Sequence, residues 1–342
     1  MTDTVRGPFI VIGENIHATR VLLRAGARVA ALPDGSPALP FTDDAGEERL
    51  LPVPGAALEG AGEKQKVKHV KAAVLAGLAG GADAELGRGY VRFLARRQAD
   101  AGADYLDLNV DEVSNDLPVR VAAMEWLVGA VEDAAPAALA LDSSAPEVMR
   151  AGLAAAARAG GAPLLNSASL ERLDVLDLAG SEGCPVVLGA AGASGMPGSA
   201  AERVANATRI IDEAFRRGIP LGGMHVDALV MPVAVEPEVG AWFLEAVSTL
   251  RQAHGSEIHL TGGLSNVSFG LPLRKLLNDV FINLAADAGA DSGIIDPVAS
   301  DPRRVFAQDR SSRAYAMAAD LLTGRDAFGM EFLTAYRAGE LA

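Results

Sequence analysis

The amino-acid sequence predicts a (β/α)8 barrel, and three observations lead to that prediction. Short apolar runs with strand character alternate with longer helical runs, as in βαβ units built around a parallel sheet. Eight such strand-and-helix pairs can be counted, which is the number that closes a barrel. No Gly-x-Gly-x-x-Gly turn follows the first strand, so a doubly wound nucleotide-binding sheet is the weaker alternative.

Each expected strand is a short apolar run bounded by turn residues. The strands are expected at 9–13, 104–110, 137–142, 163–167, 185–190, 224–230, 257–262 and 291–296. The helices are expected near 84–101, 118–132, 146–159, 170–181, 199–217, 237–253, 271–288 and 301–323. The whole chain, 1–342, is expected to be a single barrel domain.

One segment interrupts the alternation, because residues 18–85 lie between the first strand and its helix. Its first part contains the turn signals Pro-Asp-Gly-Ser and Asp-Asp-Ala-Gly between short apolar runs, which predicts a small antiparallel meander. Residues 63–79 read as a helix with a basic first half. An insertion after the first strand emerges at the C-terminal face of a barrel, where active sites lie. A lid, a partner-docking element and a structural decoration all remain open.

Composition excludes several classes of protein. The net charge of −14 argues against a general nucleic-acid or anionic-membrane surface, but it permits docking to a basic partner. A single cysteine, Cys184, excludes an internal disulfide framework and a Cys-rich metal site. The N-terminus has no apolar signal core, and no run of about 18 uninterrupted apolar residues occurs. We therefore expect a cytoplasmic protein that does not bind membranes.

The expected strand ends are unusually polar, although Asp and Asn are poor strand residues. The polar residues at or near these ends include Glu14, Asn109, Asp142, Asn166, Asp227 and Asn266. Helix capping is the plain explanation for some of them. After Asp142, however, Ser144 and Glu147 are expected to form the capping box of the next helix, which leaves Asp142 without a capping role. Several such groups around one barrel mouth indicate a binding site.

The residue types at these ends suit a neutral heterocycle. The five histidines show no paired spacing, and a carboxylate cage for magnesium would more often contain several Glu or Asp residues in one short stretch, so no metal site is expected. A phosphorylated substrate would favour glycine-rich loops or basic residues near the last two strands. An aspartate can instead accept two parallel N–H bonds from an amino-pyrimidinone, while an asparagine donates to a carbonyl and accepts elsewhere.

Several motifs in this order resemble the pterin-binding methyltransferase family, which includes methyltetrahydrofolate–corrinoid protein methyltransferases and the folate module of cobalamin-dependent methionine synthase. The resemblance covers about residues 9–16 and 88–300. At the first strand the chain reads Gly-Glu-Asn-Ile-His at 13–17, where the family commonly has Gly-Glu-Arg-Ile-Asn. Its markers are GEN at 13–15, DLNV at 107–110, AMEWLV at 123–128, LDSS at 141–144, LLNS at 164–167, VDALVMPV at 226–233 and GLSNVSFGLPLRKLLNDVF at 263–281.

The resemblance implies a dihydropteroate-synthase-like TIM barrel that binds tetrahydrofolate or 5-methyltetrahydrofolate at its C-terminal mouth. It implies that Asp142, Asn166 and Asp227 hold the pterin and that Asn266 forms a hydrogen bond near N5, the atom that carries the methyl group. Arg274 matches a family arginine close to the folate, although an exposed helix arginine is an equally good explanation. Asn109 and Glu14 complete the expected substrate-binding set.

The implied reaction moves a methyl group between tetrahydrofolate and a corrinoid, in a direction that the sequence leaves open. No Asp-x-His-x-x-Gly stretch is present, so the corrinoid is expected on a partner protein, and a homodimer is expected. One alternative is dihydropteroate synthesis, which would need a cationic pyrophosphate site that the strand ends do not offer. The other is a pterin-binding protein without catalysis.

Overall fold

The computed structural model describes residues 9–156, 161–192 and 195–341. By its internal contacts the chain divides into two compact units, Gly13–Asn166 and the remainder, Met1–Ile12 with Ser167–Ala342. Each unit is described by itself.

Eight parallel strands and the helices between them form the predicted (β/α)8 barrel fold. The order in the sheet is β13-β12-β11-β10-β9-β8-β1-β14. At the two ends of that order, the N–H of Ile294 donates to the carbonyl of Gly262 (2.9 Å), which links β14 to the end of β13. The strands are β1 (Ile10–His17), β8 (Tyr105–Asn109), β9 (Ala138–Asp142), β10 (Leu164–Ala168), β11 (Val186–Gly189), β12 (Met224–Asp227), β13 (His259–Thr261) and β14 (Ser292–Ile295). All eight lie where the sequence predicts a strand, and β1 runs four residues further than expected, to His17.

The strands read as nearly continuous apolar runs because both faces of a parallel barrel sheet are covered. Leu106, Leu108, Ala140, Leu141 and Leu164 are all fully buried. Polar residues therefore concentrate where the strands end, and the register of the sheet decides which of them become neighbours.

Most of the expected helices are present. They are α2 (Ala82–Asp100), α3 (Leu117–Val131), α4 (Pro146–Ala155), α5 (Asp174–Glu182), α6 (Ala200–Arg216), α7 (Val239–His254) and α8 (Arg274–Ala288). The helix expected over 146–159 ends at Ala155, and residues 157–160 lie outside the described residues. The helix expected over 301–323 is wrong as a single element: it forms α9 (Pro302–Phe306) and α10 (Arg313–Leu322). Asp309 separates the two, because its carboxylate accepts from the N–H and hydroxyl of Ser311 in a local turn. The turn η5 (Ala327–Gly329) and helix α11 (Met330–Arg337) were not expected.

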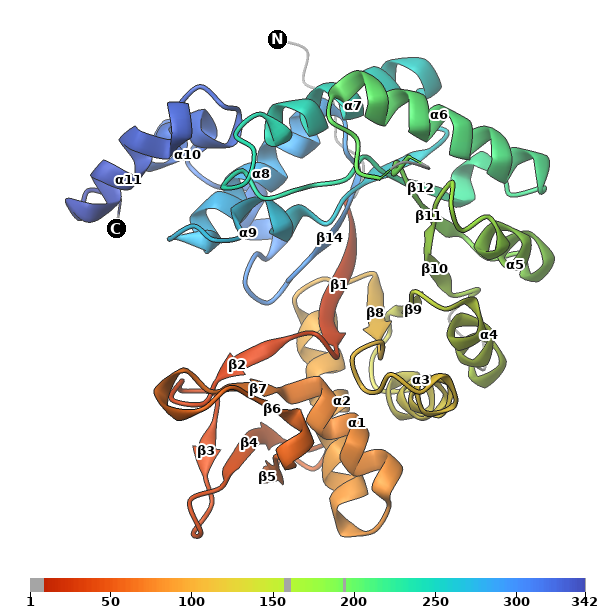
Figure 1. The fold of residues 1–342 in the computed structure, drawn as a ribbon, viewed down its shortest axis with the longest axis vertical. Helices are drawn as coiled ribbons and strands as arrows, with labels where there is room; N and C mark the ends of the chain where they lie inside the picture. The colour runs from red at the N-terminus through yellow and green to blue at the C-terminus, as the bar shows by residue number, and fades with distance from the viewer. Residues whose placement is uncertain (1–8, 157–160, 193–194, 342) are drawn as a thin grey trace. The chain divides into compact units, whose positions relative to one another are not determined.

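The insertion after β1 forms two small antiparallel sheets (Figure 1), and the sheet β3-β4-β5 lies in the part where the meander is expected. One sheet has the order β2-β7-β6 and the other β3-β4-β5. The elements are β2 (Val21–Leu23), β3 (Ala30–Ala31), β4 (Pro37–Thr42), β5 (Glu48–Pro52), η1 (Gly55–Ala57), β6 (Leu58–Glu59), η2 (Gly62–Lys64) and β7 (Lys66–Lys68). Phe41 of β4 is buried and makes an edge contact with Tyr90 of α2, with ring centroids 5.8 Å apart. The position of the insertion at the C-terminal face of the barrel stays a prediction.

The helix expected over 63–79 is wrong in its first part, because α1 spans His69–Ala79. The basic residues before it alternate about a buried Val67, and they form β7, which pairs with β2 through Val67 opposite Leu22. Alternation of period two is typical of a strand with one covered face, and it outweighs the helix propensity of the lysines. Within the described residues, no helix is both long and apolar enough to cross a membrane.

Candidate functional site

Three of the predicted site residues form a row across three neighbouring strands of the first unit. Asn109, the last residue of β8, is in register with Asp142, the last residue of β9, and Asp142 is in register with Asn166 of β10. Side chains in register on parallel strands point to the same face of the sheet. The amide of Asn109 donates to Oδ2 of Asp142 at 3.0 Å, and the N–H of Asp111 donates to Oδ1 of Asn109 at 3.1 Å. Asn109 therefore has both amide atoms bonded within the protein and holds Asp142 in place.

A buried ion pair lies beneath this row. Asp107 is fully buried two residues before Asn109, so its side chain points to the same face of the strand. Nε2 of His17, at the end of β1, lies 2.7 Å from Oδ2 of Asp107 and 3.7 Å from Oδ2 of Asp142. The amide of Asn166 donates to both carboxylate oxygens of Asp107 at 3.3 Å. Asp107 thus links the end of β1 to the end of β10.

Two opposing effects set the protonation of this cluster. Burial disfavours the charged imidazole of His17, but the charge of Asp107, its hydrogen bond, and the charges of Asp142 and Glu14 outweigh burial and raise the pKa of His17 to about 9. Burial and the neighbouring charge of Asp107 raise the pKa of Asp142 to about 7, while His17 and the amide of Asn109 oppose that rise. The cluster therefore holds a proton on His17 near neutral pH.

His17, Asp107 and Asp142 are also the group of described residues whose ligand atoms lie close enough for a metal ion, all within 4.8 Å of one another. The direct bond from His17 and the two contacts from Asn166 already engage both oxygens of Asp107. The contacts that the structure shows are those of an ion pair, and the expectation of no metal site stays a prediction.

Glu14 lies near the same cluster but is held by another partner. Nη1 of Arg20 donates to Oε1 of Glu14 at 3.0 Å, and Nη2 donates to the side-chain oxygen of Asn15 at 2.6 Å. The Gly13-Glu14-Asn15 stretch is thus fixed by an arginine from the start of the insertion. A role of Glu14 in substrate binding stays a prediction.

The capping box expected from Ser144 and Glu147 is wrong. The N-cap of α4 is Ala145, and no side chain caps it. The N–H of Ser144 donates instead to Oδ2 of Asp111 at 2.7 Å, and the hydroxyl of Ser143 donates to Oδ1 of Asp111 at 2.6 Å. Asp111 from the neighbouring loop thus takes the N–H that a capping box would direct to Glu147. The conclusion that Asp142 has no capping role still holds, since it bonds Asn109.

In the second unit, Asp227 ends β12 in register with Gly189 of β11 and Thr261 of β13. Its Oδ1 accepts from the N–H of Leu229 at 2.7 Å, and this local turn holds Leu229 at a positive φ of 66°. Burial raises the pKa of Asp227 to about 6, against the hydrogen bond from Leu229 and the charge of Arg203. Asp227 is therefore a buried carboxylate with one oxygen engaged.

Asn266 lies in a 3-10 turn, η4 (Leu264–Ser268), and not at the start of a long helix. Its backbone forms the bonds of the turn: its N–H donates to Gly263 (3.0 Å) and its carbonyl accepts from Phe269 (3.1 Å). The side chain is exposed, which leaves its amide accessible to a ligand. A Cβ at Gly263 would lie 2.8 Å from Nδ2 of Asn266, so a larger residue there would displace this amide.

Arg274 is exposed at the first position of α8, and its guanidinium binds the η4 turn. Nη2 donates to the carbonyl of Ser265 at 3.0 Å, Nε donates to the hydroxyl of Ser268 at 3.1 Å, and the group lies 4.4 Å from the centre of the Phe269 ring. These contacts define Arg274 as a residue that positions the turn. Contact with folate stays a prediction.

The sequence did not single out His17 or Asp107 as members of the site. Their pairing joins two strands that are 90 residues apart in the chain, so no local spacing reveals it. The signal that was available is the departure at residue 17, where a histidine stands in place of the family's usual asparagine.

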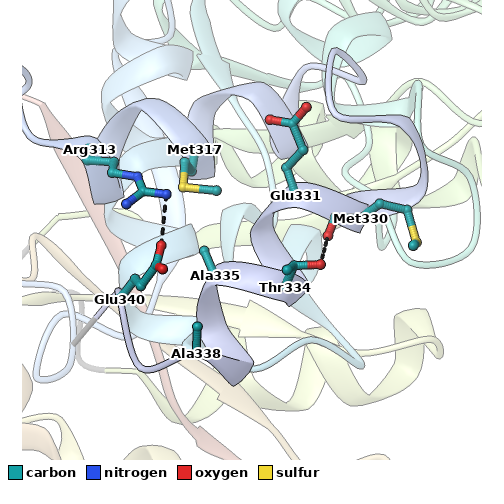
Figure 2. A pocket seen from close by; sticks show the side chains of 8 residues that line it. All are labelled: Arg313, Met317, Met330, Glu331, Thr334, Ala335, Ala338 and Glu340. Carbon is teal, nitrogen blue, oxygen red and sulfur yellow. Dashed lines mark hydrogen bonds and ion pairs between the residues drawn. The ribbon is translucent and has the colours of Figure 1, made fainter.

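A separate hollow of about 470 Å³ lies at the C-terminal helices α10 and α11. Figure 2 shows the ion pair between Arg313 and Glu340 (2.8 Å) beside Met317. Its described lining residues all belong to the segment 313–340 and include no strand-end residue. It is therefore not the site that the sequence predicts.

A parallel eight-stranded barrel with carboxylates and amides at its strand ends defines the class of (β/α)8 barrel enzymes with a polar site for a small molecule. The chain belongs to the pterin binding enzyme family, whose model matches residues 91–296. The predicted resemblance is confirmed at the level of this family.

Relatives and solved structures agree with the family. The chain is 28% identical over 257 residues to the methylcorrinoid:tetrahydrofolate methyltransferase of Eubacterium limosum, a match that covers 74% of this chain and 89% of that protein. It is 31% identical over 217 residues to the methionine synthase of Mycobacterium tuberculosis, covering 59% of this chain but only 18% of that much longer protein. The dihydropteroate synthase of Xanthomonas albilineans is similar in fold, with a TM-score of 0.51, 22% identity, and coverage of 67% of this chain and 86% of that one.

Proposed function

We propose that this protein transfers a methyl group between N5 of tetrahydrofolate and the cobalt of a corrinoid carried by a partner protein. The observation that carries the proposal is the row of Asn109, Asp142 and Asn166 in register, in a chain of the pterin-binding family. The similarity to a methylcorrinoid:tetrahydrofolate methyltransferase supports this reaction over others in the family. The cytoplasmic location and the homodimer stay predictions.

We propose that Asp142 and Asn166 bind the amino-pyrimidinone edge of the pterin. The free lone pairs of Asp142 suit the parallel N–H groups of the amino-pyrimidinone, because a carboxylate accepts two such bonds with good geometry. The amide nitrogen of Asn166 is directed to Asp107, so its Oδ1 is the atom available to a ligand. Asp227, with one oxygen bonded to Leu229, is proposed as a further pterin-binding residue, as the family resemblance implies.

We propose that the side chain of Asn266 forms the hydrogen bond near N5. In the forward direction the N5–carbon bond breaks, the cobalt–carbon bond forms with the electron pair of Co(I), and a proton is added to N5; the reverse direction runs the same balance backwards. A neutral N5 is a poor leaving group, so a proton must reach it as the bond breaks. The exposed amide of Asn266 cannot supply the proton itself but can orient it, through water if necessary.

The reaction is tested by mixing the purified protein with 5-methyltetrahydrofolate and a reduced corrinoid, free or protein-bound, and recording the visible spectrum of the cobalt. We expect the Co(I) spectrum to be replaced by that of methyl-Co(III), and the reverse change from methylcorrinoid and tetrahydrofolate. A folded protein that gives no change in either direction would contradict the proposal.

The assigned role of Asn266 is tested by Asn266→Ala. We expect a loss of about 10²- to 10³-fold in transfer rate, because a donor that acts mainly in the transition state is removed. Folate binding, measured by titration calorimetry, should change little. Gln252→Ala is the matched control, since Gln252 is an exposed amide on α7 that donates to Ser248; its rate should equal that of the wild type. An unchanged rate in Asn266→Ala would remove this residue from the mechanism.

A further inference from the structure

His17 faces two carboxylates from two different strands. Nε2 lies 2.7 Å from Asp107 of β8 and 3.7 Å from Asp142 of β9, and the side chains of His17 and Asp107 are 16% and 0% exposed. Glu14 of β1 adds a third negative charge near the ring, and Asp111 of the loop after β8 adds one near Asp142. Three acidic groups thus act on one imidazole, and a fourth acts on Asp142.

Other cations near the cluster are directed to other acids. Arg20 bonds Glu14 at 3.0 Å, and Nη1 of Arg120 lies 3.7 Å from Oδ1 of Asp111. Among the described residues, His17 is therefore the cation that lies between Asp107 and Asp142. Two like charges that share one partner cannot both stay ionised in a buried site unless that partner is charged.

We propose that His17 is a positioning residue whose imidazolium neutralises Asp107 and so favours the ionised form of Asp142, the acceptor for the pterin edge. This inference rests on the proposed function, because it assigns a purpose to the ionised form of Asp142. His17 touches neither the pterin nor the methyl group in this scheme; it acts through the two carboxylates.

The direction of the effect follows from the electrostatics. Asp107 raises the pKa of Asp142 and His17 lowers it, so a neutral residue at position 17 moves the pKa of Asp142 upward. A protonated Asp142 offers an O–H where the amino-pyrimidinone presents N–H groups, and one acceptor is lost. Loss of the charge at position 17 should therefore weaken pterin binding at neutral pH and spare it at higher pH.

The first test does not depend on folate. The imidazoles of the full-length protein are titrated by NMR from about pH 5 to about pH 10, and the signal that disappears in His17→Gln identifies His17. We expect a midpoint near 9, as its raised pKa implies, and a lower midpoint in Asp107→Asn. A midpoint at or below the ordinary value of 6.5 would overturn the inference.

The second test measures the affinity for 5-methyltetrahydrofolate as a function of pH by calorimetry. In His17→Gln we expect the midpoint of the affinity profile to move upward by about one pH unit. The affinity near pH 7 should then fall about fivefold, because the ionised fraction of Asp142 drops from about one-half to about one-tenth. Glutamine can still donate to Asp107, so the variant removes the charge and keeps a donor. His259→Gln is the matched control, because His259 forms a similar bond with Asp291 (2.9 Å) in the other unit; its profile should not move.

A double variant separates electrostatics from structure. The double variant His17→Gln, Asp107→Asn lacks both the cation and the carboxylate that competes with Asp142. The midpoint of its pH profile of folate affinity should therefore return toward that of the wild type. A weaker affinity with an unchanged midpoint in His17→Gln, or no recovery in the double variant, would overturn the inference. If the wild type binds no folate at any pH while His17 titrates near 9, the proposed function fails and the ion pair stands.

Discussion

Asp227 illustrates how a single carboxylate can be kept available at a cost in stability. It is accompanied by Arg203 of α6, which is fully buried and whose Nη1 donates to the carbonyls of Pro197 and Ser199, both at 3.1 Å. Nε and Nη2 of Arg203 have no hydrogen-bond partner among the described residues. Even with this charge nearby, burial keeps the pKa of Asp227 at about 6.

Asp227 makes the free energy of unfolding depend on pH. A carboxyl whose pKa is 3.8 when unfolded and about 6 when folded contributes most stability when protonated, and that contribution is lost as pH rises through 6. Asp227→Asn keeps the acceptor for Leu229 and removes the titration. The free energy of unfolding of the variant minus that of the wild type should therefore be about 1 kcal/mol larger at about pH 8 than at about pH 5. Urea unfolding of both proteins at the two pH values checks this. A variant-minus-wild-type difference in free energy of unfolding that becomes smaller as pH rises would contradict it.

Residues at strand ends were predictable, whereas their partners were not. Asn109, Asp142 and Asn166 stand out in the sequence because Asp and Asn are disfavoured in strands, and the register brings them into one row. His17 escapes such reasoning because its partner comes from another strand. The capping box failed for the same reason, since Asp111 from a neighbouring loop competes for the N–H of Ser144.

At the scale of the element, the η4 turn depends on its neighbour α8. Arg274 and Asn278 both reach the turn from this helix, and Ser268 donates to the side-chain oxygen of Asn278 at 2.7 Å. Leu273, the residue before α8, has a positive φ of 53°, which sets the angle at which the helix leaves the turn. The turn that carries Asn266 is thus held from outside its own five residues.

Arg274→Ala should loosen this turn without unfolding the helix. Two hydrogen bonds to Ser265 and Ser268 are lost, worth about 1–2 kcal/mol together at an exposed site. Hydrogen exchange of the amides of Phe269 and Leu271, which bond within the turn, should become about tenfold faster. Lys275→Ala is the control, because Lys275 pairs with Asp279 along the same helix. Equal exchange in wild type and Arg274→Ala would show that the arginine does not hold the turn.

Element types were largely predictable, while some boundaries were not. The eight strands follow from apolar runs of strand length, but η4 and the break between α9 and α10 depend on polar contacts that hydrophobic periodicity does not report. In the insertion, the lysines at 66 and 68 suited either a helix or a strand. They form a strand because β7 pairs with β2.

For the whole molecule, the net charge of −14 is the property that bears on partners. A chain with this charge and a sequence pI of about 4.8 repels acidic macromolecules and attracts a basic face. A corrinoid protein that exchanges methyl groups with it would then dock through a positively charged surface, and the association would be faster at low salt.

The corresponding prediction is a salt effect on the rate. With a protein-bound corrinoid as acceptor, the second-order rate should fall about tenfold as ionic strength rises from about 0.02 M to about 0.5 M, because screening shortens the reach of the charges. With free corrinoid as the control, the rate should change much less. A rate that increases with salt would indicate a partner of like charge and contradict the prediction.

The orientation of Asn166 has a consequence for ligand choice. With its amide nitrogen held by Asp107, it presents an oxygen, and Asp142 beside it presents oxygens as well. While Asp142 is ionised, this face of the site thus offers acceptors only. A pteridine in its 4-oxo tautomer presents N–H groups at N3 and at the 2-amino position and suits such a face. A 2,4-diaminopteridine has a bare nitrogen lone pair at N3, and two lone pairs would then oppose each other. The ion pair beneath the row would in this way make the protein select 4-oxo pteridines over 4-amino ones.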